Sequence, residues 1–232
     1  MSRIGIIGAM ELEVDKLKSE MDISGIANKA GMEFFQGTLQ GAEVVIVRSG
    51  IGKVNAALCV QILADDFQVT HIINTGVAGS LNAKLDIGDI LISKTALYHD
   101  VDATIFGYLP GEVPQLGTRE FPADERLAQL AKSSCEKVNP GLHAVIGRVI
   151  SGDQFISDGA VKKRLISEFH GDCAEMEGAA VAHGSYLNHI PFVIIRAISD
   201  KADDSANMDY AAFERKAIEH SVNLMMEMCS QL

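Results

Sequence analysis

The chain has 232 residues, a slightly positive mean hydropathy and a formal net charge of −11. This length supports a large core, and we expect one domain over residues 1–232. The acidic balance argues against a nucleic-acid partner, because phosphate binding needs a basic face. The sequence contains no uninterrupted run of 18 apolar residues, so we predict no membrane span.

Apolar strand-like runs alternate with helical patterns along the chain, which is typical of an α/β protein. We therefore predict a central mixed, mostly parallel twisted sheet flanked by helices. The predicted strands are 3–8, 32–39, 43–48, 70–74, 89–93, 143–151 and 192–200, and the predicted helices are 11–21, 53–67, 161–169, 176–188 and 210–228.

The cysteines and the N-terminus indicate a cellular compartment. Four cysteines are far apart and form no C-x-x-C pair, which favours reduced thiols over a disulfide framework. The N-terminal residues lack the architecture of a signal peptide and lead directly into a predicted strand. We expect a cytoplasmic protein.

The segment 99–122 interrupts the alternation of strands and helices. It contains three prolines and three glycines and is too long for a routine connection. One interpretation is a surface excursion. Phe106 and Tyr108 would be costly to expose to water, so we favour burial against a second subunit.

Several common motifs are absent. Residues 5–8 do not form the dinucleotide-binding fingerprint, and Gly52-Lys53 lacks the flanking residues of a phosphate-binding loop. No G-x-S-x-G and no H-E-x-x-H pattern occurs. Two groups have weak metal-ligand spacing. His99, Asp100 and Asp102 alternate along one loop, and such residues rarely converge on a metal by themselves. Asp200, Asp203 and Asp204 lack the glycine and the terminal glutamate of a calcium loop, so we favour a solvated loop there.

Four short motifs follow or end predicted strands: 8–13, 74–79 (predicted as a turn), 151–156, and 175–177 together with 199–200. Each has a structural explanation. Glu13 and Glu177 could complement helix N-termini, Phe155 could be core, and Asp200 could cap a turn. Their coincidence at the carboxyl edge of one sheet, where α/β proteins bind ligands, favours a site.

The residue types in these motifs suit one class of ligand. A carboxylate can accept hydrogen bonds from a sugar diol, and an aromatic ring can stack on a planar base. Two further carboxyl groups can handle protons at opposite ends of an N-glycosidic bond, where the base leaves protonated and water attacks the sugar.

Across residues 3–230 the chain resembles the bacterial 5′-methylthioadenosine/S-adenosylhomocysteine nucleosidases, of the purine nucleoside phosphorylase-like superfamily. The motifs that carry the resemblance are 5–11, 49–53, 74–76, 151–153, 175–177 and 196–200. It implies hydrolysis of the N-glycosidic bond to adenine and a 5-thioribose product, in methionine salvage, methyl-cycle detoxification and autoinducer-2 precursor supply. It also implies a homodimer that needs no cofactor or metal.

The resemblance implies catalytic and sugar-binding roles by position. Glu13 matches the base that activates water, and Asp200 matches the acid that protonates adenine N7. Glu177 matches the carboxylate that holds the ribose hydroxyls, with Met176 packing under the sugar. Phe155 matches the ring that stacks on adenine.

The resemblance also implies the remaining parts of the pocket. The backbone of Ile156 would read the adenine edge, and Ser199 and Arg196 would organise the acid and the ribose side. The residues implied to line the rest of the pocket are Ala78 and Gly79, then Met10, Ile51 and Tyr210 around the 5′-alkylthio group, and Phe106 and Pro114 lent by the partner subunit.

Two departures bear on substrate preference. Val77 stands where some relatives have serine, so Asp200 must be oriented by another group. Tyr210 stands where phenylalanine is common, which makes the 5′ pocket more polar.

Three alternatives stay open. A phosphorylase would need basic residues where Met10 and Glu13 stand. A non-catalytic nucleoside-binding protein should have lost Glu13 or Asp200. Aminodeoxyfutalosine hydrolase shares the site chemistry.

Overall fold

The computed structural model describes residues 2–203 and 206–232, without the side chains of residues 207–209 and 211–212. The strands are β1 (Arg3–Gly8), β2 (Asp22–Lys29), β3 (Met32–Leu39), β4 (Ala42–Arg48), β5 (His71–Ser80), β6 (Ile90–Tyr98), β7 (Phe121–Pro122), β8 (Ala144–Ser151), β9 (Cys173–Glu175) and β10 (Phe192–Asp200). The helices are α1 (Glu11–Ser19), α2 (Lys53–Asp65), α3 (Glu125–Val138), α4 (Gly159–Phe169), α5 (Gly178–Leu187) and α6 (Ala206–Cys229), with a 3₁₀ turn, η1, at Thr104–Phe106.

The strands form one mixed sheet in the order β10-β6-β8-β9-β5-β1-β4-β3-β2, with β7 on β6. Its central pairs are parallel: β1 with β4 and β5, β10 with β5, and β8 with β6 and β9. Antiparallel pairs build the β2–β3–β4 meander and join β10 to β6. The mixed α/β sheet flanked by helices is confirmed.

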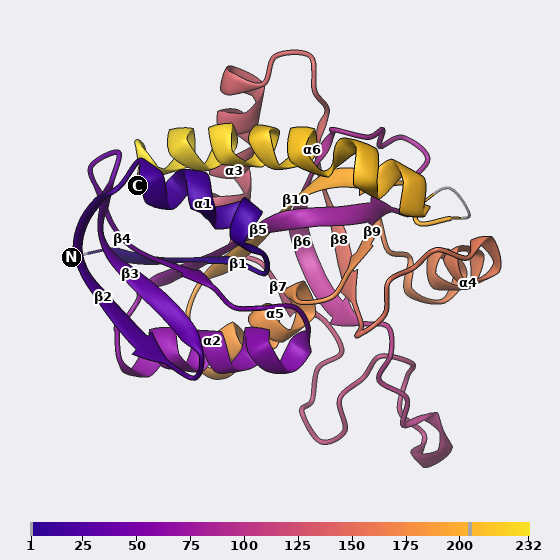
Figure 1. The fold of residues 1–232 in the computed structure, drawn as a ribbon. Coiled ribbons are helices and arrows are strands. Elements are labelled where there is room, and N and C mark those ends of the chain that lie inside the picture. The colour runs from indigo at the N-terminus through magenta and orange to yellow at the C-terminus, as the bar shows by residue number, and fades with distance from the viewer. Residues whose placement is uncertain (1, 204–205) are drawn as a thin grey trace.

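Helices cover both faces of the sheet (Figure 1). On one face, α2 and α5 bury small and branched residues against the strands. On the other face, α1, α3 and α6 pack over β1, β4 and β10. Since both faces are covered, the central strands are apolar throughout, as in the uninterrupted buried run of β10.

Besides the 3₁₀ turn η1, four elements escaped prediction: β2, β7 and β9, whose sequences carry weak local signals, and helix α3. The edge strand β2 is polar and mostly exposed, so no apolar alternation marks it. The strand β9 has three residues, and its pairing depends on β5 and β8. Helix α3 does carry a signal, because the Asp124 side chain accepts a hydrogen bond from the N–H of Leu127 at 2.8 Å, which is an N-cap.

Several predicted boundaries are wrong. The strand predicted over 89–93 is only the first part of β6, which continues to Tyr98 because its second half also pairs with β8. The helix predicted from 210 begins at Ala206. The predicted turn at 74–79 is the second half of β5, because its small residues pair with β10 from Ile194 to Asp200. The helix predicted from Met176 begins at Gly178. Glu175 ends β9, and its carboxylate accepts hydrogen bonds from the N–H groups of Glu177 and Gly178, which delays the first helical turn.

The described cysteine side chains are buried and carry no disulfide. Among the helices in the described ranges, none combines the length and apolar character that crossing a membrane requires.

Candidate active site

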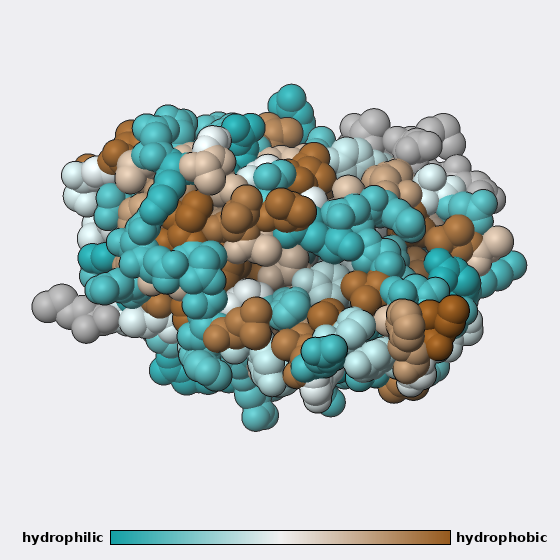
Figure 2. Space-filling view, turned by 90° about the horizontal axis from the view of Figure 1, so that it is seen from below, coloured by the Kyte–Doolittle hydropathy of each residue, from teal (hydrophilic) through white to brown (hydrophobic). Residues whose placement is uncertain are grey.

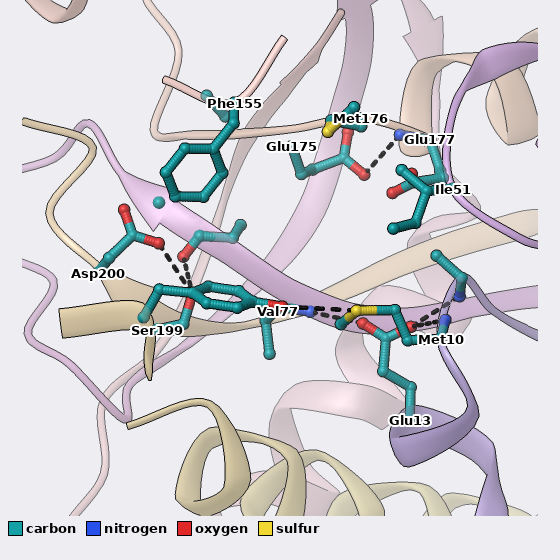
Figure 3. Close-up of a pocket in the computed structure, with 15 residues that line it drawn as sticks. Met10, Glu13, Ile51, Val77, Phe155, Glu175, Met176, Glu177, Ser199 and Asp200 are labelled. Atoms are coloured by element: carbon teal, nitrogen blue, oxygen red, sulfur yellow. Dashed lines mark hydrogen bonds between the residues drawn. The ribbon is translucent and has the colours of Figure 1, made fainter. Parts of the chain in front are cut away.

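A cavity of about 260 Å³ lies at the carboxyl ends of the central strands (Figure 3). Eleven of the residues predicted for the site line it: Met10, Glu13, Ile51, Ala78, Gly79, Phe155, Met176, Glu177, Ser199, Asp200 and Tyr210. Ala9, Val77, Ala174 and Glu175 also contribute. The sheet thus brings together segments that are far apart in sequence.

Glu13, in the first turn of α1, is almost fully buried at one end of the cavity. Its Oε2 accepts hydrogen bonds from the N–H of Ala9 at 2.6 Å and of Met10 at 2.9 Å. Its Oε1 accepts from the N–H of Val77 at 3.3 Å. Burial raises the pKa of Glu13, while these N–H groups and the charge of Arg196 act in the opposite direction.

Asp200, the last residue of β10, is buried at the other end of the cavity. Its Oδ2 accepts from the hydroxyl of Ser199 at 2.9 Å, and its Oδ1 accepts from the N–H of Ala202 at 2.7 Å. The register between β10 and β5 shifts between Ile198 and Asp200. A bulge of this kind re-aims a side chain, and here it sets Asp200 at the cavity.

The prediction that another group orients Asp200 in the absence of a serine at position 77 fits these contacts. Val77 offers no side-chain donor, and Ser199 supplies the hydroxyl instead.

Glu177, the N-cap residue of α5, is the third buried carboxyl group at the cavity. Its Oε1 accepts from the N–H of Gly52 at 2.8 Å. Gly52 has φ +98°, a conformation that glycine adopts readily, and this directs its N–H toward Glu177. Burial, followed by the nearby charge of Glu175, raises the pKa of Glu177 to about 8.

Phe155 is the principal aromatic surface of the cavity. It is 48 % exposed and lines the cavity, so it is available for stacking. The ring of Tyr210 meets it edge-on, with centroids 5.9 Å apart. The interpretation of Phe155 as core is wrong, because the loop after β8 carries this ring to the cavity instead of into the sheet.

Sequence reasoning missed a buried network behind the cavity. The guanidinium of Arg196 donates to Glu175 Oε2 from Nη2 at 2.5 Å and from Nε at 3.1 Å, and to Asn74 Oδ1 at 2.5 Å. The hydroxyl of Ser151 also donates to Glu175. The network ties β5, β8, β9 and β10 together, and its sequence signal is a charged residue, Arg196, inside an apolar strand.

Four predicted site residues do not line this cavity. Arg196 is directed into the buried network, and the Ile156 side chain packs in a small core under α4. Phe106 and Pro114 lie in the segment 99–122, which projects from the body of the molecule (Figure 1). Phe106 is 79 % exposed.

Most members of the two weak metal-ligand groups have other partners. The exception is His99, which is buried and whose ring nitrogens form no hydrogen bond. Asp200 is buried at the cavity, so the expectation of a solvated loop is wrong for this residue. Lys53 forms ion pairs with Asp100 at 2.5 Å and with Asp153 at 3.5 Å, so an ammonium group already occupies that position. Asp102 accepts from Thr104. Asp203 pairs with Lys162, and Asp204 lies outside the described residues. No cluster of three or more potential metal ligands occurs in the described part of the chain.

Comparison with known proteins places these features in a family. A model described as "Phosphorylase superfamily" matches residues 3–230. The chain is 42 % identical to the 5′-methylthioadenosine/S-adenosylhomocysteine nucleosidase of Halalkalibacterium halodurans, over the full length of both chains. The chain belongs to this nucleosidase family.

Solved structures agree with this assignment. The nucleosidase from Colwellia psychrerythraea, in complex with adenine, has a TM-score of 0.95 and 40 % identity, over 100 % of this chain and 96 % of that one. Futalosine hydrolase of Helicobacter pylori is also similar, with a TM-score of 0.93 and 33 % identity, over 100 % of this chain and 98 % of that one. The nucleosidase family thus shares its fold with a hydrolase that is named for another nucleoside.

Proposed function

We propose that this protein hydrolyses the N-glycosidic bond of 5′-methylthioadenosine and S-adenosylhomocysteine. The observation that carries the proposal is that two buried carboxyl groups, Glu13 and Asp200, line one cavity with a third, Glu177, and an exposed aromatic ring, Phe155. Relatives with this name match 98–100 % of the chain.

In this mechanism Asp200 donates a proton to the purine as the bond to the sugar breaks. Glu13 takes a proton from the attacking water at the opposite end of the cavity. The sugar passes through an oxocarbenium-like state, so departure of the base precedes most of the bond formation to water. Water adds OH to the sugar carbon and its proton goes to Glu13, which balances the proton that Asp200 has given up.

Each part of the substrate has a proposed contact. Phe155 stacks on the purine, and the backbone of Ile156 reads its edge. Glu177 holds the ribose hydroxyls over Met176. Met10, Ile51 and Tyr210 surround the 5′-thio group. Bound adenine in the Colwellia structure and methylthio-immucillin-A in that of the Neisseria meningitidis enzyme support a site for such ligands in this family.

The charges at the cavity favour hydrolysis over phosphorolysis. Among the described lining residues there is no Lys, Arg or His, whereas four are acidic. The guanidinium of Arg196 lies behind the cavity, and its hydrogen bonds go to Glu175 and Asn74. Phosphate would meet negative charge without a free cation, whereas neutral water would not be repelled.

The products of the reaction test the proposal. The purified protein is incubated with 5′-methylthioadenosine in phosphate buffer, with and without prior treatment with a chelator. We expect adenine and free 5-methylthioribose in both cases. A sugar 1-phosphate would instead assign a phosphorylase, loss of turnover after chelation would assign a metal, and binding without adenine release would assign a non-catalytic protein.

Aminodeoxyfutalosine hydrolysis is a second candidate, favoured by the likeness to the Helicobacter pylori futalosine hydrolase. Values of kcat/KM for the three nucleosides, measured side by side, decide between them. We expect the two 5′-thio nucleosides to be preferred, with aminodeoxyfutalosine at least about tenfold lower, equivalent to about 1.4 kcal/mol of transition-state binding.

A second copy of the chain is the proposed partner. Exposed apolar side chains lie on the face that holds α2, α5 and segment 99–122, where hydrophobic patches stand among polar ones (Figure 2). They are Ile51, Val54, Leu58, Ile105, Phe106, Leu109, Tyr186 and Leu187. Since Ile51 belongs both to this face and to the cavity, a partner seated here would complete the pocket with Phe106 and Pro114.

The dimer is tested by sedimentation and activity. We expect the mass of two chains, and a shift toward the monomer with reduced kcat/KM in Phe106→Ser. The control, Ile26→Ser, removes an exposed apolar side chain from the edge strand β2 and should change neither. A wild-type monomer with full activity would contradict the proposal.

We expect the protein to act in methionine salvage in the cytoplasm.

A further inference from the structure

Tyr210 and Glu214 form a polar pair at the end of the cavity lined by Met10. Both belong to α6, four residues apart, and therefore lie on the same side of the helix. The Tyr210 hydroxyl donates to Glu214 Oε1 at 2.5 Å and lies 3.4 Å from the sulfur of Met10. An acidic group thus stands directly behind the 5′ end of the proposed substrate site.

The pair presents only acceptors to an incoming group. The single proton of the hydroxyl is committed to Glu214, which leaves the lone pairs of both residues available. No ion pair joins Glu214 to a Lys or Arg within the described ranges, although Arg215 is adjacent in sequence. Glu214 and Tyr210 are both half-buried, so a cation bound here would be partly shielded from water.

We propose that Tyr210 and Glu214 recognise an ammonium group on the 5′-thio substituent, so that a homocysteinyl tail binds with its amino group at the pair and its carboxylate turned away from it. This inference rests on the proposed function. Phenylalanine at position 210 could offer neither the hydroxyl nor an anchor for the Glu214 carboxylate.

The dimensions of the substrate agree with this assignment. In S-adenosylhomocysteine four bonds separate the sulfur from the amino nitrogen, a reach of about 5 Å at roughly 1.5 Å per bond with tetrahedral angles. With the substrate sulfur beside Met10, the tail reaches past the Tyr210 hydroxyl to Glu214. A methyl group ends before it and gains nothing from the pair.

Three synthetic nucleosides isolate the charge of the tail. Their 5′-thio groups are methyl, 3-aminopropyl and 3-carboxypropyl, so they differ in charge while the purine and ribose stay the same. For the wild-type enzyme we expect kcat/KM to fall in the order aminopropyl, methyl, carboxypropyl. The aminopropyl-to-methyl ratio should be about three to ten, as for a partly exposed charged hydrogen bond.

Variants assign the effect to the pair. In Glu214→Gln and in Tyr210→Phe the aminopropyl-to-methyl ratio should fall to about one, and added salt should lower the ratio in the wild type. The matched control, Glu219→Gln, removes an exposed carboxylate from the same helix and should leave the ratio unchanged.

Two outcomes would overturn the inference while the proposed function stands: a wild-type ratio near one, or a proportional loss on all three nucleosides in Glu214→Gln, which would mark a structural role. Absence of adenine release from every nucleoside would instead refute the proposed function.

Discussion

The two ends of the cavity are built on the same plan but have different hydrogen-bonding partners. Strand β5 lies under both, and its glycines make room for the carboxyl groups. A Cβ at Gly76 would lie 2.7 Å from Glu13 Oε1, and a Cβ at Gly79 would lie 2.7 Å from Asp200 Oδ1. Two glycines of one strand, three residues apart, therefore leave space for the acid at each end of the cavity.

The hydrogen-bonding partners of the two acids differ in whether they can accept a hydrogen bond as well as donate one. Glu13 accepts hydrogen bonds from the backbone N–H groups of Ala9, Met10 and Val77, which can only donate, so its oxygens are held as acceptors and suit a base. Asp200 is bonded to the Ser199 hydroxyl, which can donate to an ionised carboxylate or accept from a protonated one. Asp200 can hold or release a proton without losing this partner.

Removing each carboxyl group is the most severe test of this comparison. Asp200→Asn and Glu13→Gln should each lower kcat by about 10²–10⁴-fold, because each removes one proton transfer. Adenine release measures the rate, and circular dichroism checks that both variants fold.

A substrate with a different leaving group separates the two roles. In the p-nitrophenyl glycoside of 5-methylthioribose the leaving group is p-nitrophenolate, which needs little protonation as it departs. Asp200→Asn should regain most of its activity on this compound, whereas Glu13→Gln should not. Equal recovery by both variants would contradict the assignment of acid and base.

The glycines of β5 sharpen the comparison at a smaller scale. Gly76→Ala and Gly79→Ala should each lower kcat/KM by roughly 10–100-fold, since a displacement of about 1 Å has such a cost. Thermal denaturation should show a loss of about 1–3 kcal/mol in the free energy of unfolding, as for overpacking.

The two alanine variants should differ in their leaving-group dependence. As a fraction of wild-type activity, the activity of Gly79→Ala should be higher on the p-nitrophenyl compound than on methylthioadenosine. The same fraction for Gly76→Ala should not differ between the two substrates. Gly25→Ala is the control, because a Cβ there would approach nothing closer than 3.5 Å. A loss at Gly25 equal to that at Gly76 would contradict the close-approach argument.

Glu177 links proton binding to stability. Its pKa is raised from an ordinary 4.5 to about 8, so the folded protein binds a proton that the unfolded chain releases. The contribution of this proton binding to the free energy of unfolding is complete below about pH 4.5 and is lost as the pH rises through about 8. The melting temperature of the wild type should therefore fall over this range more than that of Glu177→Gln, and parallel curves would refute the linkage.

Position 77 should have the smallest effect. Val77→Ser adds a hydroxyl between the two ends of the cavity, but Ser199 already donates to Asp200. We expect kcat on methylthioadenosine to change less than about threefold, since a neutral hydrogen bond contributes about 1 kcal/mol or less. A larger rise would mean that Ser199 alone does not orient Asp200.

Prediction of the strands from sequence succeeded where a continuous run of residues is buried. The runs in β1 and β10 are apolar because neighbours cover both faces, so their sequences mark them as strands. The candidate acids were found because they stand at the ends of such runs. The turn assigned to 74–79 failed because small residues, chosen for close approach to Glu13 and Asp200, imitate turn residues.

The amino-acid sequence by itself determined the α/β class, the family and the residues Glu13, Phe155, Glu177 and Asp200 as parts of one site. The tertiary structure alone decided that Glu175 and Arg196 pair behind the cavity and that Glu214 stands behind Tyr210. The physical reason is that local patterns report burial and backbone conformation, whereas partners of charged groups depend on strands and helices brought together from distant segments.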